Sequence, residues 1–136
     1  MPSLSNDART TAGILLLTIV AVEWGGTFML RIVRGRQPMT KFQHAFARAG
    51  HAHAGVLVTL SLVCQLFVDS ADVHGLLGLL ARSGVPFAAV LMPAGFFLSS
   101  AGRGTTEPNR LIVLLWAGTV SLALGVVSLG VGLLAA

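Results

Sequence analysis

The chain has 136 residues, of which 54% are hydrophobic and 10% are charged, and its formal net charge at pH 7 is +4. A soluble domain has about a quarter of its residues charged, so this composition excludes a water-facing globular surface and favours one that faces lipid. The positive charge does not indicate nucleic-acid binding, because most basic residues fall in two short segments between apolar runs. The single cysteine, Cys64, excludes an internal disulfide and a metal site built from cysteines alone.

Four apolar runs are long enough to cross a membrane as helices, which takes about 20 residues each. They cover residues 11–30, 49–68, 83–101 and 111–135. Residues 73–81 are also apolar, so an earlier start of the third helix, with a bend at Gly84 and Pro86, is an alternative. The sequence therefore predicts one all-α domain, residues 1–136, that forms an integral membrane four-helix bundle.

Lysine and arginine are unevenly distributed between the two sides of this bundle. Seven lie in the connections after the first and third runs, and two, Arg9 and Arg82, lie on the other side. Because cytoplasmic loops carry the excess of Lys and Arg, we expect a multi-pass protein of a bacterial-type inner membrane with both termini outside.

The first run contains an acid, Glu23, and the fourth contains a periodic set of small residues. A carboxyl group within a membrane is costly and normally faces protein or a cavity. Glu23 is thus either a proton donor, acceptor or cation partner, or a protonated acid bonded to a neighbouring helix. The small residues share one helix face, which predicts close packing within the bundle or between subunits; they are Gly118, Ser121, Gly125, Ser128 and Gly132.

Two histidines near the start of the second run are the strongest candidates for a binding site. His51 and His53 are two residues apart and therefore point in nearly opposite directions on a helix. They cannot both bind one metal ion, but either could hold a cofactor. Imidazole is the commonest nitrogen ligand of metals and of haem iron. The alternative is an interfacial histidine that hydrogen-bonds a carbonyl group or a lipid headgroup.

The residues around these histidines are small, which would let a flat macrocycle approach the helix; they are Ala49, Gly50, Ala52, Ala54 and Gly55. The sequence gives no support for zinc-dependent hydrolysis or for phosphate binding through a glycine loop. The chain has no H-E-x-x-H pair, no phosphate-binding glycine loop after a strand and no tyrosine.

The segment from Ala47 to Gly55 resembles the start of the second helix in the family of styrene oxide isomerase and hydroxylaminobenzene mutase. The best register places His53-Ala54-Gly55 on the family's His-x-Gly segment. The run Gly95-Phe96-Phe97-Leu98 in the third helix is similar to the family's Gly-Phe-Tyr-Leu. The competing register uses His51 instead and puts Leu57 on the family's asparagine.

The resemblance implies that His53 is the axial ligand of a haem b. Thr59 then stands where the family has a substrate-contacting asparagine, and Phe97 where it has the tyrosine that positions the epoxide. The acid of the family's third helix falls near Ala89. Ferric haem in this family acts as a Lewis acid that rearranges an epoxide to a carbonyl compound, in a trimer with the haem near the subunit contacts.

Three hypotheses follow. The first is a haem b-dependent membrane isomerase for a small hydrophobic epoxide that arrives from the bilayer. Thr59, Phe97 and Glu23 would lie near the substrate. The cofactor would be held by His53, or else by His51, with the glycines Gly50 and Gly55 beside it. The second is a non-catalytic haem-binding or sensing membrane protein. The third is a cofactor-free structural or channel-forming bundle. A homo-oligomer is expected, because four short helices bury little surface around a macrocycle.

Overall fold

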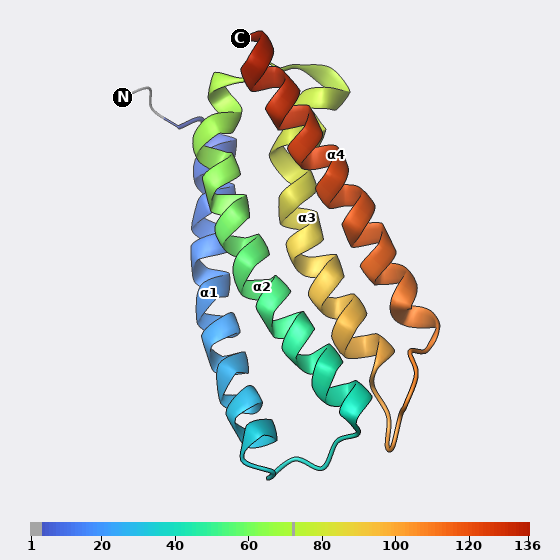
Figure 1. The fold of residues 1–136 in the computed structure, drawn as a ribbon. Helices are drawn as coiled ribbons and strands as arrows, with labels where there is room; N and C mark the ends of the chain where they lie inside the picture. The colour runs from blue at the N-terminus through green and yellow to red at the C-terminus, as the bar shows by residue number, and fades with distance from the viewer. Residues whose placement is uncertain (1–3, 72) are drawn as a thin grey trace.

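The computed structural model describes residues 4–71 and 73–136, and four long α-helices account for most of them (Figure 1). These are α1 (Asn6–Val33), α2 (Lys41–Phe67), α3 (Gly75–Ser99) and α4 (Val113–Ala135). Two short 3₁₀ helices, η1 (Val68–Ser70) and η2 (Arg110–Ile112), follow α2 and precede α4. All four long helices have the length and apolar composition of membrane spans. The predicted all-α membrane bundle is therefore confirmed.

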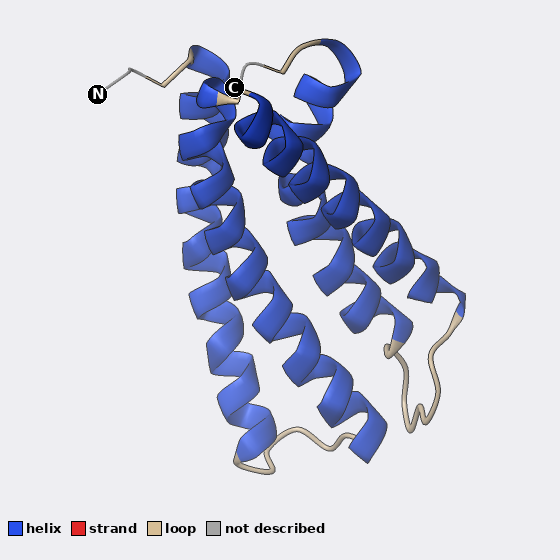
Figure 2. Ribbon diagram, turned by 45° about the horizontal axis from the view of Figure 1, so that its top comes forward, coloured by secondary structure: helices blue, strands red, loops and turns tan. Residues whose placement is uncertain are grey.

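Two loops, residues 34–40 between α1 and α2 and residues 100–109 between α3 and η2, lie at one end of the bundle, and we call them the hairpin loops. Helix α1 begins and α4 ends at the other end (Figures 1 and 2). The first three helices begin earlier than the apolar runs do, whereas α4 begins two residues later than its run, after η2. The start of α2 is set by a capping box, in which the Thr40 hydroxyl accepts from the Gln43 amide and the Gln43 side chain accepts from the Thr40 amide. For this reason Lys41 and Arg48, which precede the apolar run, belong to the helix. The third helix begins at Gly75, as the alternative prediction had it, and Pro86 lies inside it.

The helices pack in chain order. The most extensive contact joins α3 and α4, followed by α2 with α3 and α1 with α2, whereas α1 has little contact with α3. Many apolar side chains consequently point outward, such as Leu17 (74% exposed) and Trp24 (79% exposed) on α1. In water such a surface would aggregate. In a bilayer it is the surface that contacts lipid.

The small residues of α4 pack on α3 at Gly118, Ser121 and Gly125, whereas Gly132 packs on Ala71 and Val73, which precede α3. A Cβ atom added at Gly125 would lie 2.9 Å from Cα of Gly84, and one added at Gly118 would lie 2.5 Å from the Met92 side chain. The Ser121 hydroxyl also donates a hydrogen bond of 2.8 Å to the Gly84 carbonyl. Small side chains allow the two backbones to approach closely, as is common in lipid. Of the two expected uses of this face, it serves packing within the bundle.

A buried glutamine compensates for Pro86, one of the two prolines inside α3. Pro86 has no N–H, so the carbonyl of Arg82, four residues earlier, loses its helical partner. Nε2 of Gln65, a fully buried residue of α2, donates to that carbonyl at 2.9 Å. Because an unpaired carbonyl is costly in lipid, this bond lets the helix contain proline and also joins α2 to α3.

A polar cluster joins three helices at the end opposite the hairpin loops. The Asp69 carboxylate accepts from the amide and hydroxyl of Ser5, at 2.7 and 2.9 Å, and from the Arg82 guanidinium at 3.0 Å. These bonds connect the start of α1, the end of α2 and the first half of α3. They also fix the position of Arg82 beside the groove described next.

Candidate functional site

A long groove lies between α1 and α3, with α2 as its floor, because α1 and α3 both pack on α2 and hardly on each other. Its volume is about 670 Å³, within the range of roughly 300–1,000 Å³ for small-molecule sites. Most of its lining is apolar. Side chains on all three helices contribute, among them Leu15 and Val22 of α1, His51, Ala54 and Val58 of α2, and Phe87, Val90 and Phe97 of α3. We refer to it as the α1–α3 groove.

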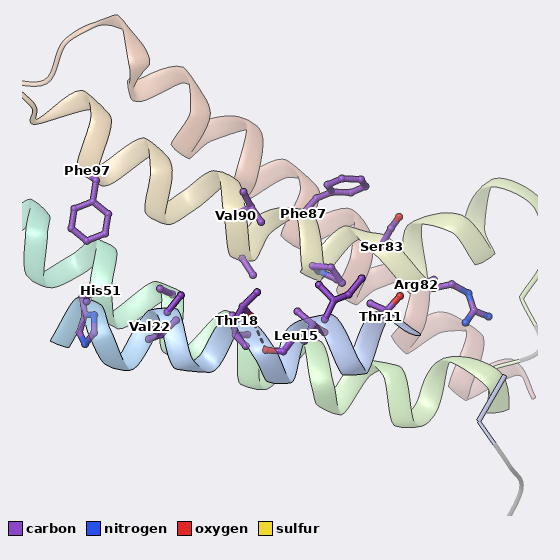
Figure 3. A pocket seen from close by; sticks show the side chains of 17 residues that line it. Thr11, Leu15, Thr18, Val22, His51, Arg82, Ser83, Phe87, Val90 and Phe97 are labelled. Carbon is purple, nitrogen blue, oxygen red and sulfur yellow. Dashed lines mark hydrogen bonds between the residues drawn. The ribbon is translucent and has the colours of Figure 1, made fainter. Parts of the chain in front are cut away.

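The two ends of the α1–α3 groove differ in chemistry (Figure 3). His51 and Phe97 lie toward one end, while Thr11, Arg82 and Ser83 lie at the other. Along α1 the lining runs from Thr11 to Gly25, which corresponds to about 21 Å of helix at 1.5 Å per residue. Arg82 is held by Asp69, whereas the His51 imidazole at the Phe97 end has no hydrogen-bond partner among the described residues.

His51 is half-buried and its ring faces two glycines of α1. A Cβ atom added at Gly25 would lie 3.7 Å from Nδ1 of His51, and one added at Gly26 would lie 3.8 Å from Nε2. Either methyl group would thus cover the ring that the glycines leave open. Within residues 4–71 and 73–136 the imidazole makes no hydrogen bond. It therefore retains its capacity to coordinate a metal or to hydrogen-bond a ligand.

His53 points away from the α1–α3 groove. Its Nδ1 lies 2.8 Å from the carbonyl oxygen of Ala49, one turn earlier on α2. Its ring packs against Phe96 of α3, with the centroids 5.0 Å apart, and Phe96 in turn contacts Phe46. When Nδ1 carries the proton and donates it to the Ala49 carbonyl, Nε2 holds the free lone pair. This is the arrangement typical of metal-ligating histidines.

Phe97 and Gly50 form the contact between α2 and α3 at the His51 end. A Cβ atom added at Gly50 would lie 3.0 Å from both Cβ of Phe96 and Cε2 of Phe97. The glycine therefore sets how closely the Phe97 ring approaches α2. Phe97 also lines a second cavity, of about 290 Å³, whose walls include Gln43, Gly102 and Arg103. Its ring thus separates the α1–α3 groove from a more polar space near the hairpin loops.

The remaining candidates from the sequence lie outside the groove lining. Gly55 faces α1, where an added Cβ would be 4.0 Å from the Val22 side chain. Thr59 is exposed, and its hydroxyl donates to the Gly55 carbonyl at 2.9 Å. Glu23 is exposed on α1 and has no partner among the residues that the structure describes. A single copy of the chain thus gathers His51 and Phe97 at one site, with Gly50 behind them, but not His53, Thr59 or Glu23.

Sequence reasoning expected α1 to contribute Glu23 to this site and missed the residues of α1 that do face it, Gly25 and Gly26. The signal was present in Gly25-Gly26 next to Trp24, because paired glycines inside a membrane helix indicate the close approach of another group. The sequence did not indicate that this group is His51. It also did not place Arg82 at the far end of the same groove.

The donor set limits the chemistry that the site can perform. In the described part of the chain, no three His, Cys, Asp or Glu side chains lie close enough together to hold a metal ion. What one copy of the chain offers a metal here is a single imidazole, that of His51 or that of His53. Comparisons of the chain with protein-family models, with curated proteins and with solved structures found no match.

Proposed function

We propose that this chain is a haem b-dependent membrane isomerase that rearranges a small hydrophobic epoxide to a carbonyl compound. The observation that carries the proposal is the His51 imidazole, which has no partner among the described residues and faces an apolar groove of about 670 Å³. An apolar pocket with few polar groups is the usual form of a small-molecule site. The resemblance noted in the sequence supplies the reaction type.

His51 and His53 both have the chemistry of a haem ligand. The family resemblance and the geometry of the groove favour different ones. The resemblance favours His53, whose Nδ1 is placed to donate to Ala49 and leave Nε2 for iron. The groove favours His51, because of the two it is the one that shares a cavity with Phe97. We assign the ligand to His51 on this geometry and retain His53 as the alternative.

When bound, ferric haem would supply a Lewis acid that polarises an epoxide oxygen. The chain's own residues bind the substrate and exclude water. Phe87, Val90 and Val22 offer an apolar surface along the groove, which suits a substrate that partitions from the bilayer. Phe97 lines both the groove and the second cavity, so its apolar ring lies between the His51 end and the more polar space. A dry site strengthens the polarisation of a bound oxygen.

A non-catalytic haem-binding protein is the second candidate, and one observation favours it. Phe97 has no hydroxyl group, and Thr59 lies outside the groove. Of the residues that the structure describes, His51 is therefore the one that offers a hydrogen-bonding side chain to that end of the groove. We further propose that the basic hairpin loops lie in the cytoplasm of a bacterial-type inner membrane, and that copies of the chain associate as a trimer, as the resemblance implies.

The test is a visible absorption spectrum of the protein purified in detergent, before and after dithionite, with an assay for conversion of styrene oxide to phenylacetaldehyde. We expect a Soret band that shifts on reduction and is lost in His51→Ala. His53→Ala and the control His44→Ala should retain it. A band lost in His53→Ala alone would transfer the ligand to His53. A protein that stays colourless after hemin is added would refute the proposal, and a haem protein without turnover would leave the non-catalytic function.

A further inference from the structure

We propose that the first two turns of α2 form a binding site for the phosphate group of an anionic lipid. The site is a cavity of about 420 Å³ lined by Met39, Lys41, His44, Ala45 and Arg48. We call it the basic pocket. It is separate from the α1–α3 groove and shares none of its lining residues, so this inference is independent of the proposed function.

The three nitrogen-bearing side chains of the basic pocket share one face of α2. Lys41, His44 and Arg48 are spaced by three and four residues, which places them on adjacent turns of one side. An ammonium and a guanidinium group thus flank a common space. Charge-assisted hydrogen bonds from such groups to phosphate oxygens are the strong class of hydrogen bond.

The positive charge of the basic pocket is not neutralised by the protein. Helix α2 contains no Asp or Glu. Neither Lys41 nor Arg48 pairs with a carboxylate within the described ranges, in contrast to Arg82, which is held by Asp69. The same end of the bundle carries further cations; these are Arg31, Arg34, Arg36, Arg103 and Arg110. The two cations are therefore available to an anion from outside the chain.

The charged groups that would recognise the anion are side chains. The capping box already uses the Thr40 hydroxyl to satisfy the Gln43 amide, and the cations of the pocket belong to the side chains of Lys41 and Arg48. Recognition of the anion should therefore respond to substitution of Lys41 and Arg48.

The surroundings of the basic pocket favour a lipid over free phosphate. Ala45 is exposed beside the charged groups, and exposed Ala52 and Val56 continue the same side of α2 toward the membrane interior. An acyl chain can follow these small and apolar side chains while its phosphate remains at Lys41 and Arg48. The ligand class is thus an anionic phospholipid at the end of the bundle that bears the hairpin loops.

The experiment is a titration of the full chain in detergent with phosphatidylglycerol, read as bound lipid by native mass spectrometry, with phosphatidylcholine as the neutral comparison. The double variant Lys41→Gln/Arg48→Gln removes the two charges of the pocket. The matched control Arg34→Gln/Arg36→Gln removes two charges from the neighbouring loop and leaves the pocket intact. All four side chains are exposed, and circular dichroism confirms that the helices are kept.

We expect one phosphatidylglycerol to bind in preference to phosphatidylcholine. The pocket variant should weaken it about 30-fold, since each cation near an anionic lipid contributes about fivefold, and the loop variant should weaken it less than about threefold. Equal weakening in both variants, or equal binding of the two lipids, would overturn the proposal. Competition by millimolar inorganic phosphate would identify free phosphate as the source of the anion. Binding without such competition identifies the lipid.

Discussion

The crossing of α3 and α4 offers the sharpest test of the fold. Substituting Gly84→Ala adds a methyl group that would lie 2.5 Å from Cα of Gly125 and 2.8 Å from the Ser121 carbonyl oxygen. Carbon atoms in contact normally lie about 3.5–4.0 Å apart. All the nearest atoms belong to backbone, so no side chain can rotate away. The helices must separate by about 1 Å to accommodate the substitution.

The cost of that separation can be worked from its parts. Overpacking of this kind costs about 1–3 kcal/mol. Separation also stretches the 2.8 Å bond from the Ser121 hydroxyl to the Gly84 carbonyl, and such bonds between membrane helices contribute about 0.6 kcal/mol. The intrinsic helix preference of alanine over glycine returns about 1 kcal/mol. The net loss in free energy of unfolding is thus about 0.5–2.5 kcal/mol.

The matched control is Gly130→Ala on α4, where an added Cβ would have no atom within 4 Å. Both substitutions gain the same helix preference, so their difference isolates the contact. Unfolding in mixed micelles with rising SDS, followed by the fluorescence of Trp24 and Trp116, measures both. We expect Gly84→Ala to unfold at a lower SDS fraction than wild type and Gly130→Ala at an equal or higher one. Identical midpoints for the two variants would refute the close crossing.

Two further predictions concern α2. Gly50→Ala should shift the Phe97 ring and lower the affinity of the α1–α3 groove for styrene oxide by severalfold, because the new Cβ would be 3.0 Å from that ring. The control Gly55→Ala, whose Cβ would be 4.0 Å from its nearest neighbour, should leave binding within twofold; an equal loss in both would contradict the role of Gly50. Gln65→Leu should cost about 1–3 kcal/mol of unfolding free energy by leaving the Arg82 carbonyl unpaired. In a Pro86→Ala background the backbone N–H of residue 86 can again donate to the Arg82 carbonyl. A double-mutant cycle of Gln65→Leu and Pro86→Ala should therefore show a coupling of about 1 kcal/mol. Additive losses would disprove the hydrogen bond from Gln65 to Arg82.

The sequence alone was sufficient to predict the class of fold. Runs of about 20 apolar residues with few charges can satisfy their backbone in lipid only as helices, so the number of spans followed from composition. Their starts were less certain, because hydropathy ends where charge begins, whereas Thr40 and Gln43 cap a helix that continues through Lys41 and Arg48. The capping pattern was visible in the sequence, but the helix starts were predicted from the length of the apolar runs alone.

The candidate site was predictable only in part, for a geometric reason. The angle of 100° per residue is a local property, and it requires His51 and His53 to face opposite ways whatever the helix packs against. Likewise, the spacing of the small residues on α4 requires them to share one face. The neighbour that covers each face cannot be predicted from local sequence, because it depends on how the helices pack.

The tertiary structure decided that α1 and α3 flank α2 without closing on each other. That arrangement leaves the α1–α3 groove, turns His51 and Phe97 into it and leaves His53 against Phe96. Pairwise packing of this kind arises from contacts between residues far apart in the chain, such as Gly25 with His51 and Gly84 with Gly125. Local patterns therefore determined the helices and their faces, and only long-range packing determined which faces meet.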